Sequence, residues 1–385
     1  MTSLLVLVVL VLVSVAIWQL TKIFDLTQIG GNADNSQVAN DNDNNVNGYL
    51  MFAFLVFIYL TTIFCVVQYG HFPLMSNSAS EHGVEVDRLM WISMILIFFV
   101  QTITQALLHY YSFKYRGKKE NKALYFADNN KLEMIWSIIP AITLAGLILY
   151  GLYAWTNIMF VDEETENPMI VEIYAKQFGW EVRYAGEDNV LGKANVRYIE
   201  GTNTLGVDLA DPNAQDDIQA NELHLPKGVK VLFKIRSQDV LHSAYMPHFR
   251  AQMNCVPGMV TQFAFTPTMT TEEMRNTQAM QEKVTEINRI RAEKSIQLVK
   301  DGKAALDPYI FDYLLLCNKI CGSSHYNMQM KIVVESKEDF KKWLNEKTTF
   351  AQNAKAEKEA NEKSETVIDT TLSVVKDSTL VATNK

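Results

Sequence analysis

The strongest constraint on the fold of this chain is the uneven placement of its apolar residues. Four apolar stretches fall in the first 160 of 385 residues, and each is close to the ~20 residues that an α-helix needs to cross a bilayer. They run from about Leu4 to Leu20, Tyr49 to Gln68, Leu89 to His109 and Met134 to Trp155. We therefore expect a membrane domain over residues 1–160 with about four transmembrane helices. The first stretch lacks the basic start of a signal peptide, so we expect it to be retained.

The positions of lysine and arginine predict how these helices are oriented. A short basic segment, Lys114 to Lys131, joins the third and fourth stretches and should face the cytoplasm. The chain after Phe160 then lies on the outer side. This topology predicts a multi-pass protein of a bacterial inner (plasma) membrane with a periplasmic domain. The Asn- and Asp-rich segment from Asn32 to Asn47 lies on the inner side and reads as a flexible linker.

Beyond the membrane segments the pattern changes to short alternating runs that are typical of strands. These runs are Ile170–Tyr174, Trp180–Tyr184, Val229–Ile235, Gln262–Phe265 and Met330–Val334. They predict an all-β sandwich or Greek-key barrel over residues 161–345. Residues 185–219 read as a surface excursion, residues 271–306 as a helical insertion and residues 346–385 as a disordered polar tail.

The helical insertion has one apolar stripe, formed by Met280, Val284 and Ile287. This stripe allows two interpretations. The helix either docks a partner or packs on its own barrel.

A cluster of soft ligands lies just before the last expected strand. Cys317, Cys321, His325 and Met328 fall within twelve residues. A thiolate, an imidazole and a weakly bound methionine are the ligands of electron-transfer copper, and methionine disfavours zinc. A second thiolate would allow two copper ions to be bridged. Such a site needs a further imidazole. His242, which follows the expected strand Val229–Ile235 and so lies near the end of a rigid element, could supply it or could be purely structural.

With these residues assembled, the chain resembles subunit II of the haem–copper cytochrome c oxidases. The resemblance covers roughly Asp87 to Trp343 and rests on four motifs. These are Leu132–Pro140, Lys176–Trp180, Asp239–Ser243 with Val256–Gly258, and the loop Cys317–Met328. It implies N-terminal transmembrane helices followed by a cupredoxin-like Greek-key barrel with a helical insertion. The loop alone would also fit nitrous oxide reductase, which does not share the paired membrane helices.

The family implies a dinuclear copper A centre with a defined set of ligands. By resemblance, Cys317 and Cys321 bridge the two copper ions. His242 and Met328 complete one copper, and His325 and the backbone carbonyl of Lys319 complete the other. Relatives usually have Glu at the position of Lys319 and often Asp at Asn254. A lysine cannot ligate magnesium or manganese, so that hard-cation site is not expected here.

The resemblance also implies the function of the chain and the roles of two further residues. The family accepts electrons from cytochrome c at copper A and passes them to the haem and copper of subunit I. Oxygen is reduced there to water, and the reaction drives proton pumping. Phe178 matches the aromatic residue at which electrons enter, and Glu133 matches a carboxylate at the mouth of a proton channel. Each residue also has a purely structural interpretation. Phe178 could be a strand residue that packs on the barrel, and Glu133 could be an acidic residue that is favoured at the start of a helix.

The expected partners are subunit I, other oxidase subunits, membrane lipid and a cytochrome c donor, with no nucleic acid. No Cys-x-x-Cys-His haem motif occurs, so the donor is a separate protein or a bound cytochrome c domain, and haem belongs to partner subunits. An acidic surface would steer a basic donor. The alternatives are a membrane-anchored copper carrier or oxidase assembly factor, and a quinol oxidase subunit, although such subunits lack copper ligands.

Overall fold

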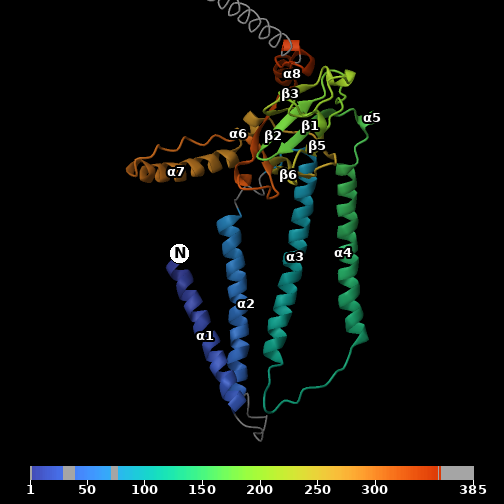
Figure 1. Ribbon diagram of the computed structural model, residues 1–385. Helices are drawn as coiled ribbons and strands as arrows, with labels where there is room; N and C mark the ends of the chain where they lie inside the picture. The colour runs from blue at the N-terminus through green and yellow to red at the C-terminus, as the bar shows by residue number, and fades with distance from the viewer. Residues whose placement is uncertain (1, 29–39, 71–76, 354, 357–385) are drawn as a thin grey trace, which may run out of the picture. The chain divides into compact units, whose positions relative to one another are not determined.

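The computed structural model describes residues 2–28, 40–70, 77–353 and 355–356 (Figure 1). The chain divides into two compact units. One comprises Met1–His71 and Ser93–Ala141, and the other comprises Phe72–Ile92 and Ile142–Lys385. The boundary predicted at residue 161 therefore differs from the division in the structure, because the outer ends of two long helices belong to the β-rich unit.

Four long helices occupy the N-terminal part of the chain. They are α1 (Thr2–Gln28), α2 (Asp41–Tyr69), α3 (Glu81–Lys114) and α4 (Asn130–Met159). Among the described residues, α2, α3 and α4 are long and apolar enough to cross a membrane, whereas α1 contributes a shorter apolar stretch, Val8–Thr21. Three of the four predicted spans thus have the required length, and the span at α1 stays a prediction.

Helix α2 starts earlier than the sequence suggested. Its first residues, Asp41 to Asn47, belong to the segment predicted to be a flexible linker, and residues 32–39 of that segment lie outside the described residues. The Asn40 side chain caps the helix by accepting a hydrogen bond from the Asp43 amide at 2.9 Å. Asp41 and Asp43 also favour the positive end of the helix dipole. These local effects explain why a polar sequence is helical here.

The second unit contains two five-stranded sheets. Their strand orders are β3-β2-β1-β5-β8 and β4-β10-β9-β6-β7. The strands are β1 (Met169–Lys176), β2 (Gly179–Tyr184), β3 (Ile218–Ala220), β4 (Leu223–Pro226), β5 (Val231–Ser237), β6 (His242–Met246), β7 (Ala251–Cys255), β8 (Thr261–Phe265), β9 (Tyr313–Cys317) and β10 (Gln329–Glu335). All pairs are antiparallel except β1 with β5 and β4 with β10. The predicted fold class, apolar helices followed by a cupredoxin-like all-β domain with a helical insertion, is confirmed.

Strand β1 lies near the middle of its sheet and is covered on both faces. Val171, Ile173 and Ala175 enter the main core between the sheets, while the alternate residue Tyr174 enters a second core with Leu205. This alternation follows from the two-residue period of a strand. The second core lies under the 185–219 excursion, which is therefore anchored to the barrel rather than loose.

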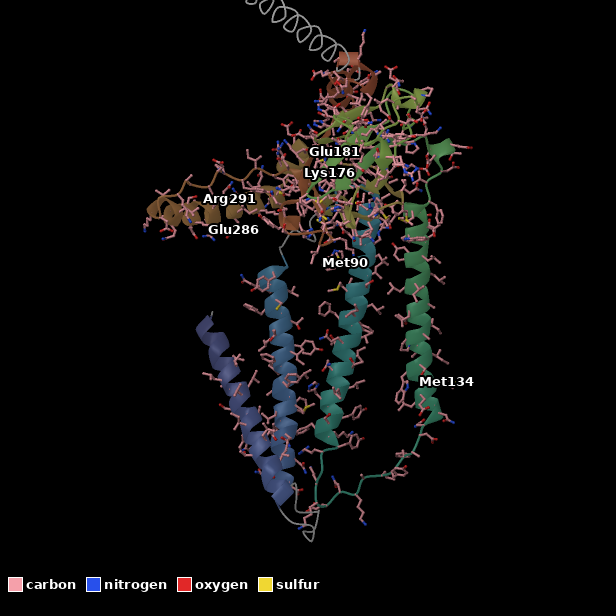
Figure 2. All side chains as sticks on the ribbon, viewed as in Figure 1. Met90, Met134, Lys176, Glu181, Glu286 and Arg291 are labelled. Carbon is pink, nitrogen blue, oxygen red and sulfur yellow. The ribbon has the colours of Figure 1, made fainter. Side chains whose placement is uncertain are left out.

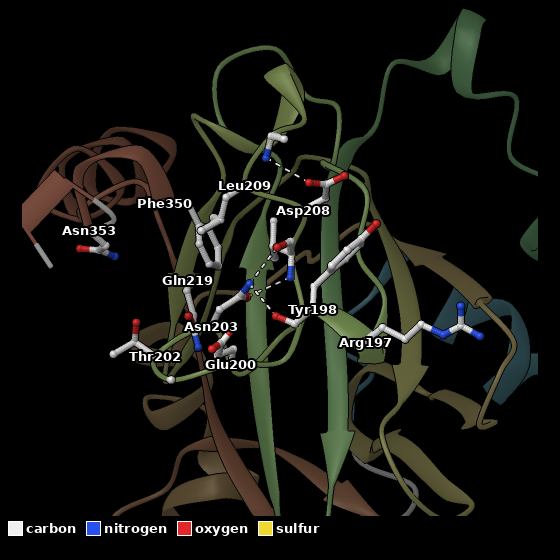
Figure 3. A pocket seen from close by; sticks show the side chains of 13 residues that line it. Arg197, Tyr198, Glu200, Thr202, Asn203, Asp208, Leu209, Gln219, Phe350 and Asn353 are labelled. Carbon is white, nitrogen blue, oxygen red and sulfur yellow. Dashed lines mark hydrogen bonds between the residues drawn. The ribbon is translucent and has the colours of Figure 1, made fainter. Parts of the chain in front are cut away.

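Buried charges also hold this excursion. Arg183 is buried and contacts the carboxylates of Glu172 and Asp217, each at 2.7 Å, and the carbonyl of Gly192 at 2.9 Å. On its outer side the excursion forms a hollow of about 930 Å³ (Figure 3). Asn203 shapes this hollow by donating hydrogen bonds to the carbonyls of Tyr198 and Val207. Side-chain packing and paired charges thus order a segment that the sequence showed only as polar.

The segment before α3 is part of the β-rich unit. Ala79 is fully buried in its main core, and the Ser80 hydroxyl donates a hydrogen bond to the carbonyl of Phe249 at 2.6 Å. Further along α3, Asp87 forms an ion pair with Arg250 at 2.7 Å. A soluble fragment that starts at residue 161 would lack these contacts.

The predicted insertion is helical in α6 (Thr271–Arg275) and α7 (Gln278–Lys300). Met280 is buried and Val284 packs against the main core, which favours the interpretation that this stripe packs on its own barrel. The middle of α7 carries Glu286 and Arg291 (Figure 2), and the Arg291 guanidinium donates to the carbonyl of Asp307 at 2.8 Å. The helix and the segment after it therefore form an arm, residues 278–310.

The C-terminal helix α8 (Lys337–Asn345) begins at the cap residue Ser336. The chain beyond it does not leave the domain at residue 346, where the polar tail was predicted to start. Phe350 is buried in the second core, and its amide donates to the carbonyl of Asp217 at 2.9 Å. The Ala351 amide also donates to the carbonyl of Gln215 at 3.2 Å, so this segment is attached to the domain by both side-chain packing and backbone hydrogen bonds. Residues 357–385 of the predicted tail lie outside the described residues.

Candidate metal centre

The predicted ligands come from two separate parts of the second sheet. His242 is the first residue of β6, and Cys317 is the last residue of β9. The loop after β9 carries Cys321 and then the short 3-10 turn His325–Asn327. Met328 follows that turn and directly precedes β10. Since β6 and β9 are paired, with Ala244 opposite Cys317, the fold brings the histidine and the loop together.

The ligand atoms converge closely. The Sγ atoms of Cys317 and Cys321 lie 3.9 Å apart. The Nδ1 atom of His242 lies 3.8 Å from the Cys317 sulfur, and the Nδ1 atom of His325 lies 3.6 Å from the Cys321 sulfur. The Met328 sulfur is 3.7 Å from that of Cys321. Each thiol therefore has an imidazole beside it, and the thioether of Met328 lies next to the thiol of Cys321.

The sixth predicted ligand is a backbone atom. The carbonyl oxygen of Lys319 lies 3.2 Å from the Cys317 sulfur, while the lysine side chain is exposed. This geometry makes the identity of the side chain at position 319 unimportant for the carbonyl. Asn254, on β7, is also exposed.

Backbone hydrogen bonds fix the loop. The Cys317 amide donates to the carbonyl of Met328 at 3.1 Å, and the Asn318 amide donates to the carbonyl of Ser243 on β6 at 3.2 Å. Gly322 has a φ of +149°, a conformation that other residues rarely adopt. The loop is thus closed on itself and tied to the strand that carries His242.

Asp239 orients His242. Its Oδ1 atom accepts a hydrogen bond from Nε2 of His242 at 2.7 Å, which turns the other ring nitrogen, Nδ1, toward the sulfur of Cys317. Burial opposes ionisation of Asp239, but hydrogen bonds from His242 and from the amides of Gln177 and Val240 lower its pKa below the ordinary value. The ring is fully buried, which leaves this carboxylate as its polar partner.

The thiol of Cys321 is a poor acid in the absence of a metal. Burial and the charge of the neighbouring Cys317 raise the pKa of Cys321 to about 11. A bound metal ion deprotonates thiols of this kind, and the proton is released on binding. Cys321 is therefore suited to binding a metal rather than to acting as a free nucleophile.

The donor set fits copper. It has two thiols, two imidazoles, one thioether and one carbonyl, with Cys321 6%, Met328 2% and His242 0% exposed. Soft sulfur and imidazole ligands select copper over the hard cations, which need several oxygen ligands. His242, Cys317 and Cys321 already place one ligand atom each within 4.8 Å of one another. The Lys319 carbonyl, His325 and Met328 each place a donor atom within 3.7 Å of one of the two sulfurs.

The other two predicted site residues are in different surroundings. Phe178, at the turn between β1 and β2, is 37% exposed, and its ring packs over Gly322 of the metal loop. Glu133 lies in the first turn of α4, in the other compact unit, with an exposed side chain. The structure brings Phe178 to the metal loop, and it does not bring Glu133 into that group.

Two residues near the ligands were not assigned a role from the sequence. Asp239 precedes His242 by three residues, and a carboxylate so close to a candidate ligand was the available signal. Gln177 gave no such signal, because it lies 144 residues from the cysteine whose carbonyl it contacts. Of the remaining cysteines, Cys255 is buried opposite His242 on β7, and burial raises the pKa of its thiol to about 12, as expected for a packed, unreactive thiol.

Two family profiles match this chain. The profile of the family "cytochrome c oxidase subunit II, transmembrane domain" matches residues 68–154, and that of "cytochrome c oxidase subunit II, periplasmic domain" matches residues 169–274. Helix α1, most of α2, the arm and the metal loop lie outside these matches.

Individual proteins are also similar. The alternative cytochrome c oxidase subunit 2 of Bradyrhizobium diazoefficiens is 32% identical over 268 residues, which cover 69% of this chain and 81% of that protein. The probable cytochrome c oxidase subunit 2 of Rickettsia felis is 23% identical over 288 residues, or 74% and 71% of the two chains. A solved periplasmic domain of cytochrome oxidase subunit II from Bradyrhizobium japonicum covers 46% of this chain and 91% of its own length, with 19% identity and a TM-score of 0.25.

The two profile matches and the first of these relatives establish the family. This chain belongs to the cytochrome c oxidase subunit II family, and is thus a membrane subunit of a haem–copper oxidase with a periplasmic domain.

Proposed function

We propose that this subunit is the entry point for electrons in its oxidase. It takes electrons from a cytochrome c at a dinuclear copper A centre and delivers them to the haem and copper centre of subunit I, where oxygen is reduced to water and protons are pumped. The observation that carries the proposal is the pair of thiols 3.9 Å apart, each with an imidazole nitrogen within 3.8 Å. This spacing and symmetry suit two bridging thiolates.

The ligands have distinct roles in the proposal. Cys317 and Cys321 would supply thiolates shared by both metal ions, His242 and Met328 would be the further ligands of one ion, and His325 and the Lys319 carbonyl those of the other. When bound, the copper pair supplies a site that gains and loses one electron with little change in geometry. The surrounding protein keeps the ligands in place through the sheet, the closed loop and the hydrogen bond from His242 to Asp239.

Phe178 is proposed as the aromatic residue through which electrons arrive. Its ring combines partial exposure with contact to Gly322, one residue from Cys321. Glu133 is proposed as a carboxylate at the mouth of a proton channel, on the basis of its place at the start of α4. No magnesium or manganese site is proposed through Lys319, because its side chain is a cation.

The donor is proposed to be a cytochrome c or a bound cytochrome c domain. Between Val161 and Thr268 there are fifteen acidic and nine basic residues, an excess that would attract a basic partner. Several of these acids are already neutralised, however, including Glu172 and Asp217 by Arg183 and Glu163 by Lys234. Arg183 and Lys234 are among the nine basic residues counted, so this pairing leaves the net excess of six acidic residues unchanged.

A membrane-anchored copper carrier or assembly factor is the alternative. A carrier needs ligands that a partner can reach, whereas Cys321, Met328 and His242 are buried. The burial favours a resident centre. The proposed location is the bacterial inner membrane, with several membrane-crossing helices.

Electron paramagnetic resonance and metal analysis of the purified oxidase test the proposal. We expect two copper ions per copy of this subunit beyond the copper of subunit I, and the hyperfine pattern of one electron shared by two copper nuclei. The full chain is required, because Ala79 and Ser80 form part of the copper-bearing unit. The hyperfine pattern of a single copper nucleus would contradict the dinuclear assignment.

A further inference from the structure

Gln177 contacts both halves of the metal centre from a third part of the chain. It lies at the turn that joins β1 and β2, and neither strand carries a ligand. Its side-chain amide donates a hydrogen bond to the carbonyl oxygen of Cys321. Its backbone amide donates to Oδ2 of Asp239 at 2.7 Å. One residue thereby reaches the loop that holds the thiols and the carboxylate that holds His242.

These contacts form a continuous path between ligands that are far apart in sequence. Asp239 uses its two oxygens for two partners, the Gln177 amide on one side and the His242 ring on the other. The path therefore runs from the Cys321 carbonyl through Gln177 and Asp239 to the imidazole. A shift of the β1–β2 turn would move the thiol loop and the histidine together.

Packing beside this path limits the freedom of the loop. A Cβ atom added to Gly322 would lie 2.7 Å from Cζ of Phe178 and 3.0 Å from Nε2 of Gln177. Both distances are shorter than ordinary van der Waals contact, so the turn lies directly against the loop. Gly322, with its φ of +149°, permits this close approach. The hydrogen bond from Gln177 is thus made in a tightly packed setting, where its direction is fixed.

We propose that Gln177 is a positioning residue of the metal centre: it fixes the Cys321 segment against the β1–β2 turn and, through Asp239, sets the direction of His242. This inference rests on the proposed copper function. Groups that orient metal ligands typically contribute 10–100-fold to metal affinity or activity. Loss of the amide donor should loosen one thiol relative to the other and alter how the unpaired electron is shared.

The test compares Gln177→Leu with the wild type in the purified oxidase. Leucine keeps the backbone N–H to Asp239 and removes only the side-chain donor. We expect copper release to a chelator to become about 10-fold faster or more, with a changed hyperfine splitting and a shifted reduction potential. Gln177→Lys, which restores an N–H donor of similar reach, should move all three values back toward the wild type.

A matched control uses another glutamine of the same barrel. Gln262 lies on β8 and accepts a hydrogen bond from Lys234 at 3.0 Å, so Gln262→Leu should leave copper release, spectrum and potential unchanged. If Gln177→Leu prevents assembly, Gln177→Glu takes its place, since it keeps the size of the side chain and removes the donor.

The outcomes separate this inference from the proposed function. A wild-type oxidase without a dinuclear copper signal would overturn the proposed function. A normal wild-type signal with the same copper release and spectrum in Gln177→Leu would overturn only the role of Gln177. Equal losses in Gln177→Leu and Gln177→Lys would overturn it as well, because the effect would not depend on the donor.

Discussion

At the scale of single residues, the ligands could be predicted and their supports could not. Cys317, Cys321, His325 and Met328 are close in sequence, so their chemistry is readable as a cluster. The contact between Gln177 and Cys321 joins positions 144 residues apart and depends on how the two sheets face each other. No local pattern encodes such a contact. The roles of the ligands as copper A donors stay predictions.

Met328 gives the first prediction. A thioether is a weak copper ligand that tunes the reduction potential more than it holds the metal. Met328→Leu keeps an apolar side chain in this buried position, and we expect it to retain copper with a shifted potential and slower electron transfer. Cys321→Ser should lose the dinuclear spectrum. Metal analysis and potentiometry check both variants. If Met328→Leu loses copper while Cys321→Ser keeps the wild-type spectrum, the roles assigned to the thioether and the thiol are wrong.

His248 gives a prediction about pH. Burial, together with the charges of Lys283 and Arg250, lowers the pKa of His248 from 6.5 to about 4. Between these values the unfolded chain binds a proton that the folded chain does not, so the free energy of unfolding falls as the pH drops from 6.5 to 4. The slope from this one group is at most about 1.4 kcal/mol per pH unit.

The check compares the temperature at which half of the copper signal is lost in the wild type and in His248→Gln, at pH 7.5 and at pH 5. The His248→Gln protein should lose less stability on acidification, since glutamine does not titrate. If this temperature falls equally between pH 7.5 and pH 5 in the wild type and in His248→Gln, then His248 does not titrate in this range.

At the scale of elements, the long helices and the strands with strict alternation were predictable. Ile170–Tyr174 and Trp180–Tyr184 fall within β1 and β2, and Met330–Val334 falls within β10. The missed strands lack that signal for identifiable reasons. Strand β3 has only three residues, and β9, Tyr313–Cys317, is a continuous apolar run that could equally be a buried helical segment.

The arm formed by residues 278–310 leads to a prediction at this scale. Asn288 and Tyr309 exchange two hydrogen bonds, from the Tyr309 amide at 2.6 Å and from the Asn288 side chain at 3.1 Å. A short Gly–Ser linker between Asn288 and Tyr309 can therefore replace residues 289–308 without disturbing the barrel. We expect copper content and spectrum to be unchanged, because Met280 and Val284 remain in the core. If the assembled oxidase with this deletion loses copper, then the outer part of the arm contributes to the stability of the metal centre.

At the scale of the whole molecule, the division into units could not be read from composition. The change from apolar to polar sequence near residue 160 marks where the membrane helices end. It does not mark where the compact unit ends, because Ala79 lies in the core of the β-rich unit and Asp87 pairs with Arg250. The same holds at the other end, where Phe350 belongs to the second core although its neighbours are polar. Both exceptions depend on contacts between segments that are distant in the sequence.

The number of membrane crossings gives the last prediction. Helices α2, α3 and α4 have the length and composition of spans, and with a periplasmic metal domain they place residues before α2 in the cytoplasm. If α1 also crosses, Ser3 lies in the periplasm. If α1 does not cross, Ser3 lies in the cytoplasm. If all four helices cross the membrane, a reporter fused at Ser3 should be located in the periplasm, like a reporter at Lys227. A reporter at Lys119 should be located in the cytoplasm.

Paired fusions of a periplasm-active and a cytoplasm-active reporter at these three positions decide the matter in intact cells. Lys227, next to β4, is the outside reference, and Lys119, in the basic segment after α3, is the inside reference. A Ser3 fusion that matches Lys119 would reduce the membrane domain to three spans. If the reporters at Lys119 and Lys227 are found on the same side of the membrane, the predicted orientation is wrong. Only helix α4 separates these two positions, and it has to cross the membrane for the metal domain to meet a periplasmic donor.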